Sequence, residues 1–317
     1  MNIAYFGSGE FGLPCLDALR GSRHDLALVV TQPAQRSGRG RLPRPTRVAH
    51  WAEGHAEPFL EADNVNAPKI VERVAAGRPD IIIAIAFGQK VGTDLVGLPP
   101  KGAINVHASL LPKLRGAAPI NWALIRGESE TGLSIITLAE RMDAGDILAQ
   151  CSTPIGDYET AGELHDRLAQ MAAPLLLETL DKIEAGTATY TKQDEFLVSQ
   201  APKLNKADGF LDFSEPAYVL ASKIRGFWPW PGASVRYVNA ETGKITRVTV
   251  ALADVIWGPT PASSLAGTFD ADLNVICGDG KLQIRKIRPA GSGLMKFGAF
   301  INGWRVQPGD RLARVDD

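Results

Sequence analysis

Cysteine is scarce in this sequence, with three residues in 317, at positions 15, 151 and 277. Their number is odd, their spacing is wide, and no histidine stands beside any of them. These features argue against a disulfide framework and against a cysteine-based metal site. We therefore predict three reduced thiols and no metal.

Long apolar runs are also missing. The longest, such as Ile81–Phe87, falls well short of the roughly 20 residues that cross a membrane. The first twelve residues lack the basic and then apolar segments of a secretory signal. The sequence predicts a cytoplasmic protein with no membrane partner.

Net charge is small, at −1, but it is unevenly distributed. Residues 1–200 carry 19 Lys and Arg against 24 Asp and Glu, and residues 201–317 carry 15 against 11. The first part also contains a basic island, free of acidic residues, formed by Arg36, Arg39, Arg41, Arg44 and Arg47. Such a cluster suits a polyanionic partner, although a solvated surface has the same composition.

Strand-like and helix-like segments alternate in the first part of the chain. Asp80–Phe87 is a continuous β-branched run, which is typical of a strand buried on both faces of a parallel sheet. Further strands are expected at Asn2–Phe6, Leu26–Gln32, Ala103–His107 and Leu133–Leu138, and helices at Phe11–Leu19, Lys69–Ala76, Ala118–Arg126 and from Thr160 toward Glu184. This alternation predicts an α/β fold with a doubly wound, mostly parallel, Rossmann-like sheet.

The pattern changes after residue 206. Residues 189–206 have no clear periodicity and are interpreted as a linker between a catalytic domain, 1–188, and a second domain, 207–317. The second domain has short alternating segments separated by turn signals, which favour a small, OB-like β-barrel. The expected strands are Ser234–Tyr237, Thr246–Val255, Gly267–Phe269, Asn274–Cys277 and Leu282–Ile287.

Gly7–Gly12 matches the G-x-G-x-x-G pattern between a strand and a helix, which suggests a dinucleotide site. That site needs an acidic residue at the end of the second strand, but Val29–Gln32 offers none. The alternative, which we favour, is that the glycines permit a tight strand-to-helix turn.

Candidate catalytic residues gather between positions 103 and 146. Asn105 and His107 are two apart on a predicted strand, so both side chains project from one face. Asp143 lies in a turn after another strand, where its carboxylate could orient the imidazole. A structural histidine and an ordinary turn aspartate remain the alternatives.

This stretch resembles the formyltransferase family that uses 10-formyltetrahydrofolate. The matching features are Asn105 and His107, Ser109–Pro112, Lys113, Arg115–Gly116 and Asp143, in that order. The resemblance covers essentially the whole chain and extends to Thr31–Pro33, Gly38–Arg41, Ile224–Pro231, Pro289–Gly291 and Pro308–Leu312. It departs at Leu114, where the family usually has Tyr or Trp.

The resemblance implies transfer of a formyl group from 10-formyltetrahydrofolate to an amino group, with Asn105, His107 and Asp143 as the catalytic residues. Within the family, the similarity is to members whose acceptor is the initiator methionyl-tRNA. Implied folate contacts are Ala86, Phe87, Gly88, Ser109, Leu110, Leu111, Pro112, Met142 and Asp146. Proposed tRNA contacts are Arg36, Arg39, Arg41, Arg44, Lys206 and Arg225.

Three other functions share parts of this pattern. A sugar-nucleotide N-formyltransferase would use the same catalytic set, but would not need the basic island or a basic barrel. A formyltetrahydrofolate hydrolase would replace the amine with water. A non-catalytic RNA-binding protein would not need Asn105, His107 and Asp143 together.

Overall fold

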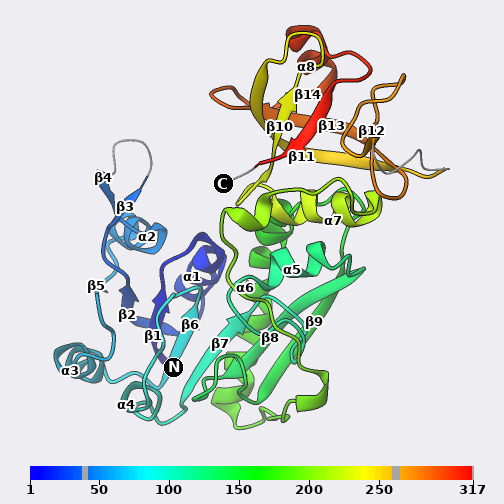
Figure 1. The fold of residues 1–317 in the computed structure, drawn as a ribbon. Coiled ribbons are helices and arrows are strands. Elements are labelled where there is room, and N and C mark those ends of the chain that lie inside the picture. The colour runs from blue at the N-terminus through cyan, green and yellow to red at the C-terminus, as the bar shows by residue number, and fades with distance from the viewer. Residues whose placement is uncertain (38–41, 259–264, 316–317) are drawn as a thin grey trace. The chain divides into compact units, whose positions relative to one another are not determined.

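The computed structural model describes residues 1–37, 42–258 and 265–315, which fold into two compact units (Figure 1). The first unit comprises Met1–Ala117, Thr131–Thr153 and His165–Ala201. The second comprises Ala118–Glu130, Pro154–Leu164 and Pro202–Asp317.

A seven-stranded sheet forms the centre of the first unit, in the order β5-β2-β1-β6-β7-β8-β9. The strands are β1 (Asn2–Gly7), β2 (Asp25–Thr31), β5 (Phe59–Glu61), β6 (Ile81–Ile85), β7 (Ala103–His107), β8 (Glu130–Thr137) and β9 (Ile147–Pro154). The pairs from β5 to β7 are parallel, whereas β7 and β8 are antiparallel. The predicted doubly wound, mostly parallel sheet is therefore confirmed.

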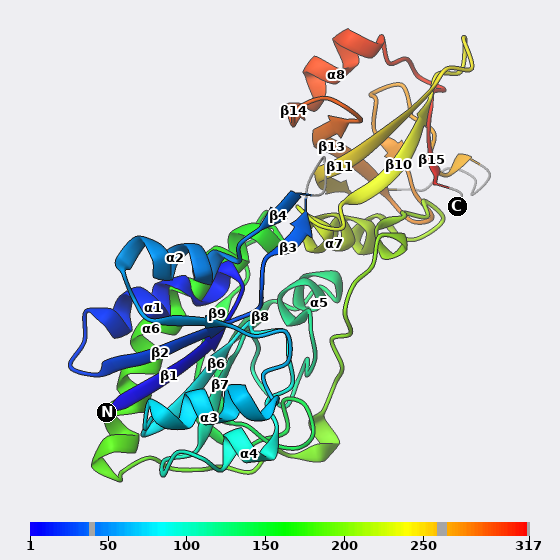
Figure 2. The same cartoon turned by 90° about the vertical axis from the view of Figure 1, so that its left-hand side faces the viewer.

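Helices cover both faces of this sheet (Figure 2). They are α1 (Leu13–Arg20), α2 (Arg47–His55), α3 (Pro68–Ala76), α4 (Thr93–Val96) and α6 (Ala161–Ala185), and a short 3-10 turn, η1 (Glu10–Gly12), precedes α1. Ile70 and Val74 of α3 share an apolar cluster with Phe6 and Ile82 on one face. Because neighbouring strand residues alternate between faces, Tyr5 points to the opposite face, toward Cys15 of α1.

The order of the strands reverses between β1 and β6. The chain runs outward from β1 to β2 and β5, then returns to place β6 and β7 on the other side of β1. In doubly wound sheets, ligands bind beyond the carboxyl ends of the strands at such a switch point. The loops after β1, β6 and β7 all leave that edge.

A second sheet, in the order β12-β13-β11-β10-β15 with β14 paired to β13, makes up most of the second unit. Its strands are β10 (Ala233–Val238), β11 (Ile245–Ile256), β12 (Val275–Ile276), β13 (Lys281–Pro289), β14 (Met295–Lys296) and β15 (Arg311–Arg314). Bridges from Thr268 to Arg311 and from Phe269 to Val275 join its two edges, giving the predicted barrel-like, antiparallel sheet.

Three helices belong wholly to this unit: α5 (Pro119–Ile125), α7 (Ala217–Phe227) and α8 (Phe297–Trp304). The Asn121 side chain of α5 donates to the Gly226 carbonyl of α7 at 2.7 Å. No helix among the described residues combines the length and apolarity that crossing a membrane requires.

Candidate active site

The loop after β1 turns tightly because its glycines leave no room for side chains. A Cβ on Gly12 would lie 1.8 Å from the Tyr5 hydroxyl, and one on Gly7 would lie 2.9 Å from the Ile85 carbonyl oxygen. The amides of Ser8 and Gly9 both donate to the Ala86 carbonyl at 3.3 Å. The glycine pattern thus joins the turn after β1 to the turn after β6, which supports the steric interpretation over the dinucleotide one.

His107 is the last residue of β7 and is buried. Its Nε2 atom lies 3.0 Å from the Leu114 carbonyl oxygen, which can only accept, so that nitrogen carries the ring proton. Its Nδ1 atom faces Asp143 Oδ1 at 3.6 Å. The predicted approach of His107 and Asp143 is confirmed, and the imidazole lies between two acceptors.

Asn105 precedes His107 by two residues on β7, so their side chains share a face. Its side chain is half-buried, and among the described residues no protein group is hydrogen-bonded to the side-chain amide of Asn105. A partly buried amide of this kind can offer its NH₂ group to a ligand.

The loop that carries Asp143 is held in an unusual conformation. Asp143 has a φ of +55°, and its Oδ2 accepts from the Gly116 amide at 2.9 Å. Gly145 packs so closely that a Cβ there would lie 1.7 Å from the Thr137 carbonyl oxygen. The Asp146 amide donates to the Thr137 hydroxyl at 2.9 Å. Backbone packing therefore fixes the direction of the Asp143 carboxylate.

Residues 191–201, within the segment interpreted as a linker, are bound to these same loops. Thr191 pairs with Ile147 of β9. The Gln193 amide nitrogen lies 2.8 Å from the carbonyls of Asp143 and Gly145, and its oxygen accepts from buried Arg115 at 2.8 and 3.0 Å. The sequence analysis missed Gln193, because no motif or periodicity marks that segment.

Ser199 and Glu195 extend this set of contacts. Ser199 accepts from the Leu114 amide through its hydroxyl and from the Arg115 amide through its carbonyl, at 3.0 and 2.9 Å. Glu195 pairs with Arg115 and Arg141 at 3.0 and 2.7 Å. Hydrogen bonds from Arg115 first, and then from Arg141, lower the pKa of the Glu195 carboxyl.

The proposed folate residues lie in three loops. Ala86 and Gly88, after β6, have φ of +47° and +78°, and the Phe87 side chain is buried against Phe6. Ser109–Pro112 follows His107 directly, with Ser109 fully buried. In the Asp143 loop, the Met142 side chain is 71% exposed. The Phe87 side chain thus packs in the core, and only its backbone remains to contact a ligand at this loop.

The basic island lies partly in a hairpin of β3 (Gln35–Ser37) and β4 (Leu42–Arg44). Arg36 is on β3, and Arg44 is exposed on β4. Arg39 and Arg41 lie outside the described residues. Arg47 begins α2 and pairs with Glu10 at 2.6 Å.

The proposed tRNA residues of the second unit differ in their surroundings. Lys206 is exposed. Arg225 donates to the carbonyls of Gly156 and Glu159 at 3.1 and 3.3 Å, and burial lowers its pKa. Trp228 is half-buried under the Arg288 guanidinium at 4.9 Å, whereas Trp230 is 51% exposed. Trp230 is thus the more accessible of the two indoles.

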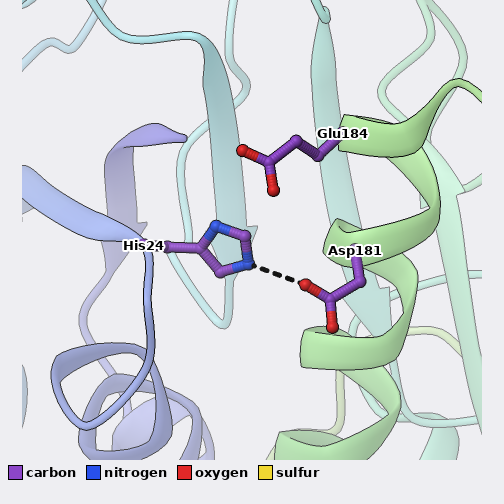
Figure 3. A group of neighbouring side chains, drawn as sticks. All are labelled: His24, Asp181 and Glu184. Carbon is purple, nitrogen blue, oxygen red and sulfur yellow. Dashed lines mark ion pairs between the residues drawn. The ribbon is translucent and has the colours of Figure 1, made fainter.

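A second cluster of ionisable groups joins the turn before β2 to α6 (Figure 3). His24, Asp181 and Glu184 could offer one ligand atom each within 4.8 Å, and among the described residues they are the only such group. Arg23 occupies both carboxylates at 2.7 Å, and the Met1 amino group contacts Glu184 at 3.3 Å and His24 at 3.2 Å. These cations already neutralise the carboxylates, so the cluster is an ion-pair network.

The cysteines fit the prediction of reduced thiols. All three are free, and Cys15 and Cys277 are buried. Burial raises the pKa of both thiols to about 12, and it also raises the pKa of Cys151. Because the thiolate is the reactive form, these groups are poor nucleophiles.

Comparison with known families and structures places these residues in context. Residues 1–180 match the model of the formyl transferase family, and residues 203–305 match the model of the formyl transferase C-terminal domain. The chain is 39% identical over 316 residues to the methionyl-tRNA formyltransferase of Citrifermentans bemidjiense, covering 100% of this chain and 98% of that one. It is 39% identical over 312 residues to the enzyme of the same name from Geobacter metallireducens, covering 98% of each.

Solved structures share the fold at lower identity. WlaRD, a sugar 3N-formyl transferase solved with dTDP and 5-N-formyl-THF, superposes with a TM-score of 0.63 at 15% identity, covering 91% of this chain and 97% of that one. HypX from Aquifex aeolicus gives a TM-score of 0.62 at 18% identity, covering 96% of this chain and 47% of that one. These likenesses support the fold.

Proposed function

The chain belongs to the formyl transferase family, and from this premise we propose that it transfers the formyl group of 10-formyltetrahydrofolate to the amino group of initiator methionyl-tRNA. The observation that carries the chemistry is the meeting of His107 and Asp143 at 3.6 Å, with Asn105 two residues before His107 on the same strand. The curated relatives of nearly equal length support methionyl-tRNA as the acceptor.

The reaction passes through a tetrahedral intermediate. The amine nitrogen attacks the formyl carbon, the carbonyl oxygen becomes an oxyanion, and the bond to N10 of the folate then breaks. The Asn105 amide donates to that oxyanion without any change in its own charge. A donor of this kind typically raises kcat by a factor on the order of 10²–10³.

His107 carries the proton from the incoming amine to the leaving nitrogen. Nδ1 is the ring nitrogen that can exchange a proton, since Nε2 donates to Leu114. When Nδ1 accepts a proton, the imidazolium lies between two acceptors, the Leu114 carbonyl and the Asp143 carboxylate. Both neighbours stabilise the positive charge that develops during proton transfer.

The folate is a cosubstrate, and the loops after β6 and β7 offer groups that suit it. Ala86 is exposed at the switch point, and the left-handed conformations of Ala86 and Gly88 turn the chain there, so that backbone groups of the loop lie at the strand end. Such groups can match the donor and acceptor edge of a pterin. We assign folate contacts to Ala86–Gly88, Ser109–Pro112, Met142 and Asp146.

We assign the acceptor to the basic residues Arg36, Arg39, Arg41 and Arg44, together with Lys206 and Arg225. Guanidinium groups bind phosphates, and a cluster of several arginines in the sequence suits the tRNA backbone. We assign catalysis to residues 1–188 and tRNA binding to the barrel, residues 207–317, in a cytoplasmic enzyme.

The proposal is tested by incubating the protein with 10-formyltetrahydrofolate and either charged initiator tRNA or an amino-sugar nucleotide, with mass detection of the formylated product. Formylmethionyl-tRNA is expected from the first mixture alone. His107→Ala should lose most of the turnover while its affinity for folate changes by only a few-fold. Formylation of the sugar nucleotide instead would replace the proposed acceptor, and a fully active His107→Ala would remove the catalytic assignment.

A further inference from the structure

Gln193 lies in the segment between the two family-model matches, where the sequence indicated only a linker. It is half-buried, while the residues on either side of it, Lys192 and Asp194, are exposed. Its side chain contacts both loops that flank the candidate catalytic pair. This placement is unusual for a residue whose surroundings otherwise face solvent.

The contacts of Gln193 use the donor and the acceptor of one amide. The NH₂ group donates to the carbonyls of Asp143 and Gly145, both at 2.8 Å. The oxygen accepts from Arg115 Nε at 3.0 Å and Nη2 at 2.8 Å. Of the common side chains, an amide is suited to donate two hydrogen bonds and accept two others at a single group.

These bonds bear directly on the direction of the Asp143 carboxylate. Asp143 has a φ of +55°, a conformation that is uncommon for residues other than glycine and that surrounding contacts must hold in place. The Gln193 side-chain NH₂ group donates to the carbonyls of Asp143 and Gly145, the residues on either side of Ala144. These two hydrogen bonds hold the backbone of the Asp143 loop in place.

The other end of the Gln193 amide reaches the chain that leads from His107. Arg115 follows Leu114, whose carbonyl accepts from His107 Nε2. The Arg115 amide is itself bound by Ser199, and the next amide, that of Gly116, donates to Asp143 Oδ2. Gln193 therefore joins the Arg115 side chain, next to the residue that accepts from the imidazole, to the backbone that carries the Asp143 carboxylate.

We propose that Gln193 is a positioning residue that sets the His107–Asp143 geometry, although it lies in the segment interpreted as a linker. The inference rests on the proposed function, because it assigns His107 and Asp143 their roles. It predicts that Gln193 affects turnover through Asp143, with little effect on the binding of either substrate.

The test compares two near-isosteric replacements. Gln193→Glu keeps the acceptor for Arg115 but loses both donors, and Gln193→Met loses donors and acceptor. Each should lower kcat by about 10- to 100-fold, because small displacements of a catalytic group cost that much. The KM for folate and for charged tRNA should stay within about 3-fold, since no ground-state contact is removed. Lys192→Ala, on the exposed neighbour, is the matched control and should keep wild-type kcat.

A double-mutant cycle shows whether Gln193 acts through Asp143. If it does, Asp143→Asn with Gln193→Glu should turn over no more slowly than Asp143→Asn alone, measured in single turnovers with excess enzyme. The positioning role would be overturned if the fold losses of turnover in the two single variants multiplied in the double variant. A wild-type kcat in both Gln193 variants would overturn it too. If Asp143→Asn itself is fully active, the catalytic assignment falls and the positioning role falls with it. An inactive Asp143→Asn beside active Gln193 variants overturns the positioning role alone.

Discussion

Single buried hydroxyls illustrate how the same side chain can stabilise one site and destabilise another. Tyr5 is fully buried, and its hydroxyl has no hydrogen-bond partner among the described residues. Tyr237 is also buried, but its hydroxyl donates to Asp310 Oδ2 at 2.5 Å. Burial is the first cause of the raised pKa of both phenols.

Replacing each tyrosine with phenylalanine should therefore have opposite effects. Tyr5→Phe removes an unsatisfied polar group and should raise the free energy of unfolding of its unit by about 1 kcal/mol. Tyr237→Phe removes a hydrogen bond to a charged group and should lower that of its unit by about 1.5–3 kcal/mol. Urea denaturation of both variants, followed by circular dichroism, checks the pair. A loss of stability in Tyr5→Phe would show that its hydroxyl has a partner in solution.

The residues proposed as catalytic were recognisable in the sequence for a simple reason. Asn105 and His107 are two apart on a strand, and strand geometry alone puts them on one face. The contact of His107 with Asp143 was expected from the turn that carries the aspartate, and it is present at 3.6 Å. Gln193 could not be predicted, because its partners, two backbone carbonyls and the Arg115 guanidinium, are far away in the sequence, and such partners leave no pattern.

At the scale of elements, buried strands and capped helices were the most predictable. The β-branched run at residues 80–87 forms β6, and the predicted capping box begins α6, with Thr160 and Glu163 bonded to each other's amides. The elements α2, α4, β5 and β9 were not predicted, and neither were α7, α8, β14 and β15. Their length or mixed polarity gives no clear period, and tertiary contacts determine them instead.

The antiparallel direction of β8 in the sheet was likewise not predicted. Strand β8 follows β7 through α5 and pairs with it in the opposite direction, with His107 opposite Ser134. An interior run of apolar residues looks the same in either direction, so the sequence indicates burial and leaves the strand direction undetermined.

The Asp143 loop depends on a glycine whose substitution tests the geometry of the element. A methyl group on Gly145 would lie 1.7 Å from the Thr137 carbonyl, so Gly145→Ala must displace the loop. We expect a fall in kcat of about 100-fold or more, because Asp143 moves with the loop. Steady-state kinetics with saturating substrates checks this outcome. Gly54→Ala in α2 is the control, since a Cβ there meets nothing within 4 Å and kcat should not change.

The junction of β2 and α6 predicts a pH dependence of stability. Burial first, and the Met1 amino group second, lower the pKa of His24 below its usual value near 6.5. In the pH window below 6.5 the unfolded chain binds a proton that the folded chain excludes, so stability should fall as pH decreases through that window. The melting temperature of wild type should therefore drop between pH 7.5 and 5.5. In His24→Asn this drop should be smaller, and an equal drop would assign the effect to other groups.

The whole molecule carries its charge unevenly, and this distribution bears on the acceptor. Residues 1–200 are net acidic, yet they include the five arginines between positions 36 and 47. A surface of negative potential repels tRNA, so the basic island is where the first part of the chain would meet phosphates. Binding at that island must release counterions, which makes it sensitive to salt.

Removing two of these arginines should change tRNA recognition without changing the chemistry. Arg39→Ala with Arg41→Ala should raise the KM for charged tRNA and reduce the slope of log affinity against log salt by about 1–2 units. Lys69→Ala with Arg73→Ala removes the same charge from exposed positions on α3 and is the matched control, with the slope expected to remain that of wild type. Folate affinity should be unchanged in both double variants. Titration of charged tRNA at two salt concentrations measures the slope, and a slope unaffected by loss of Arg39 and Arg41 would move the tRNA contact away from the basic island.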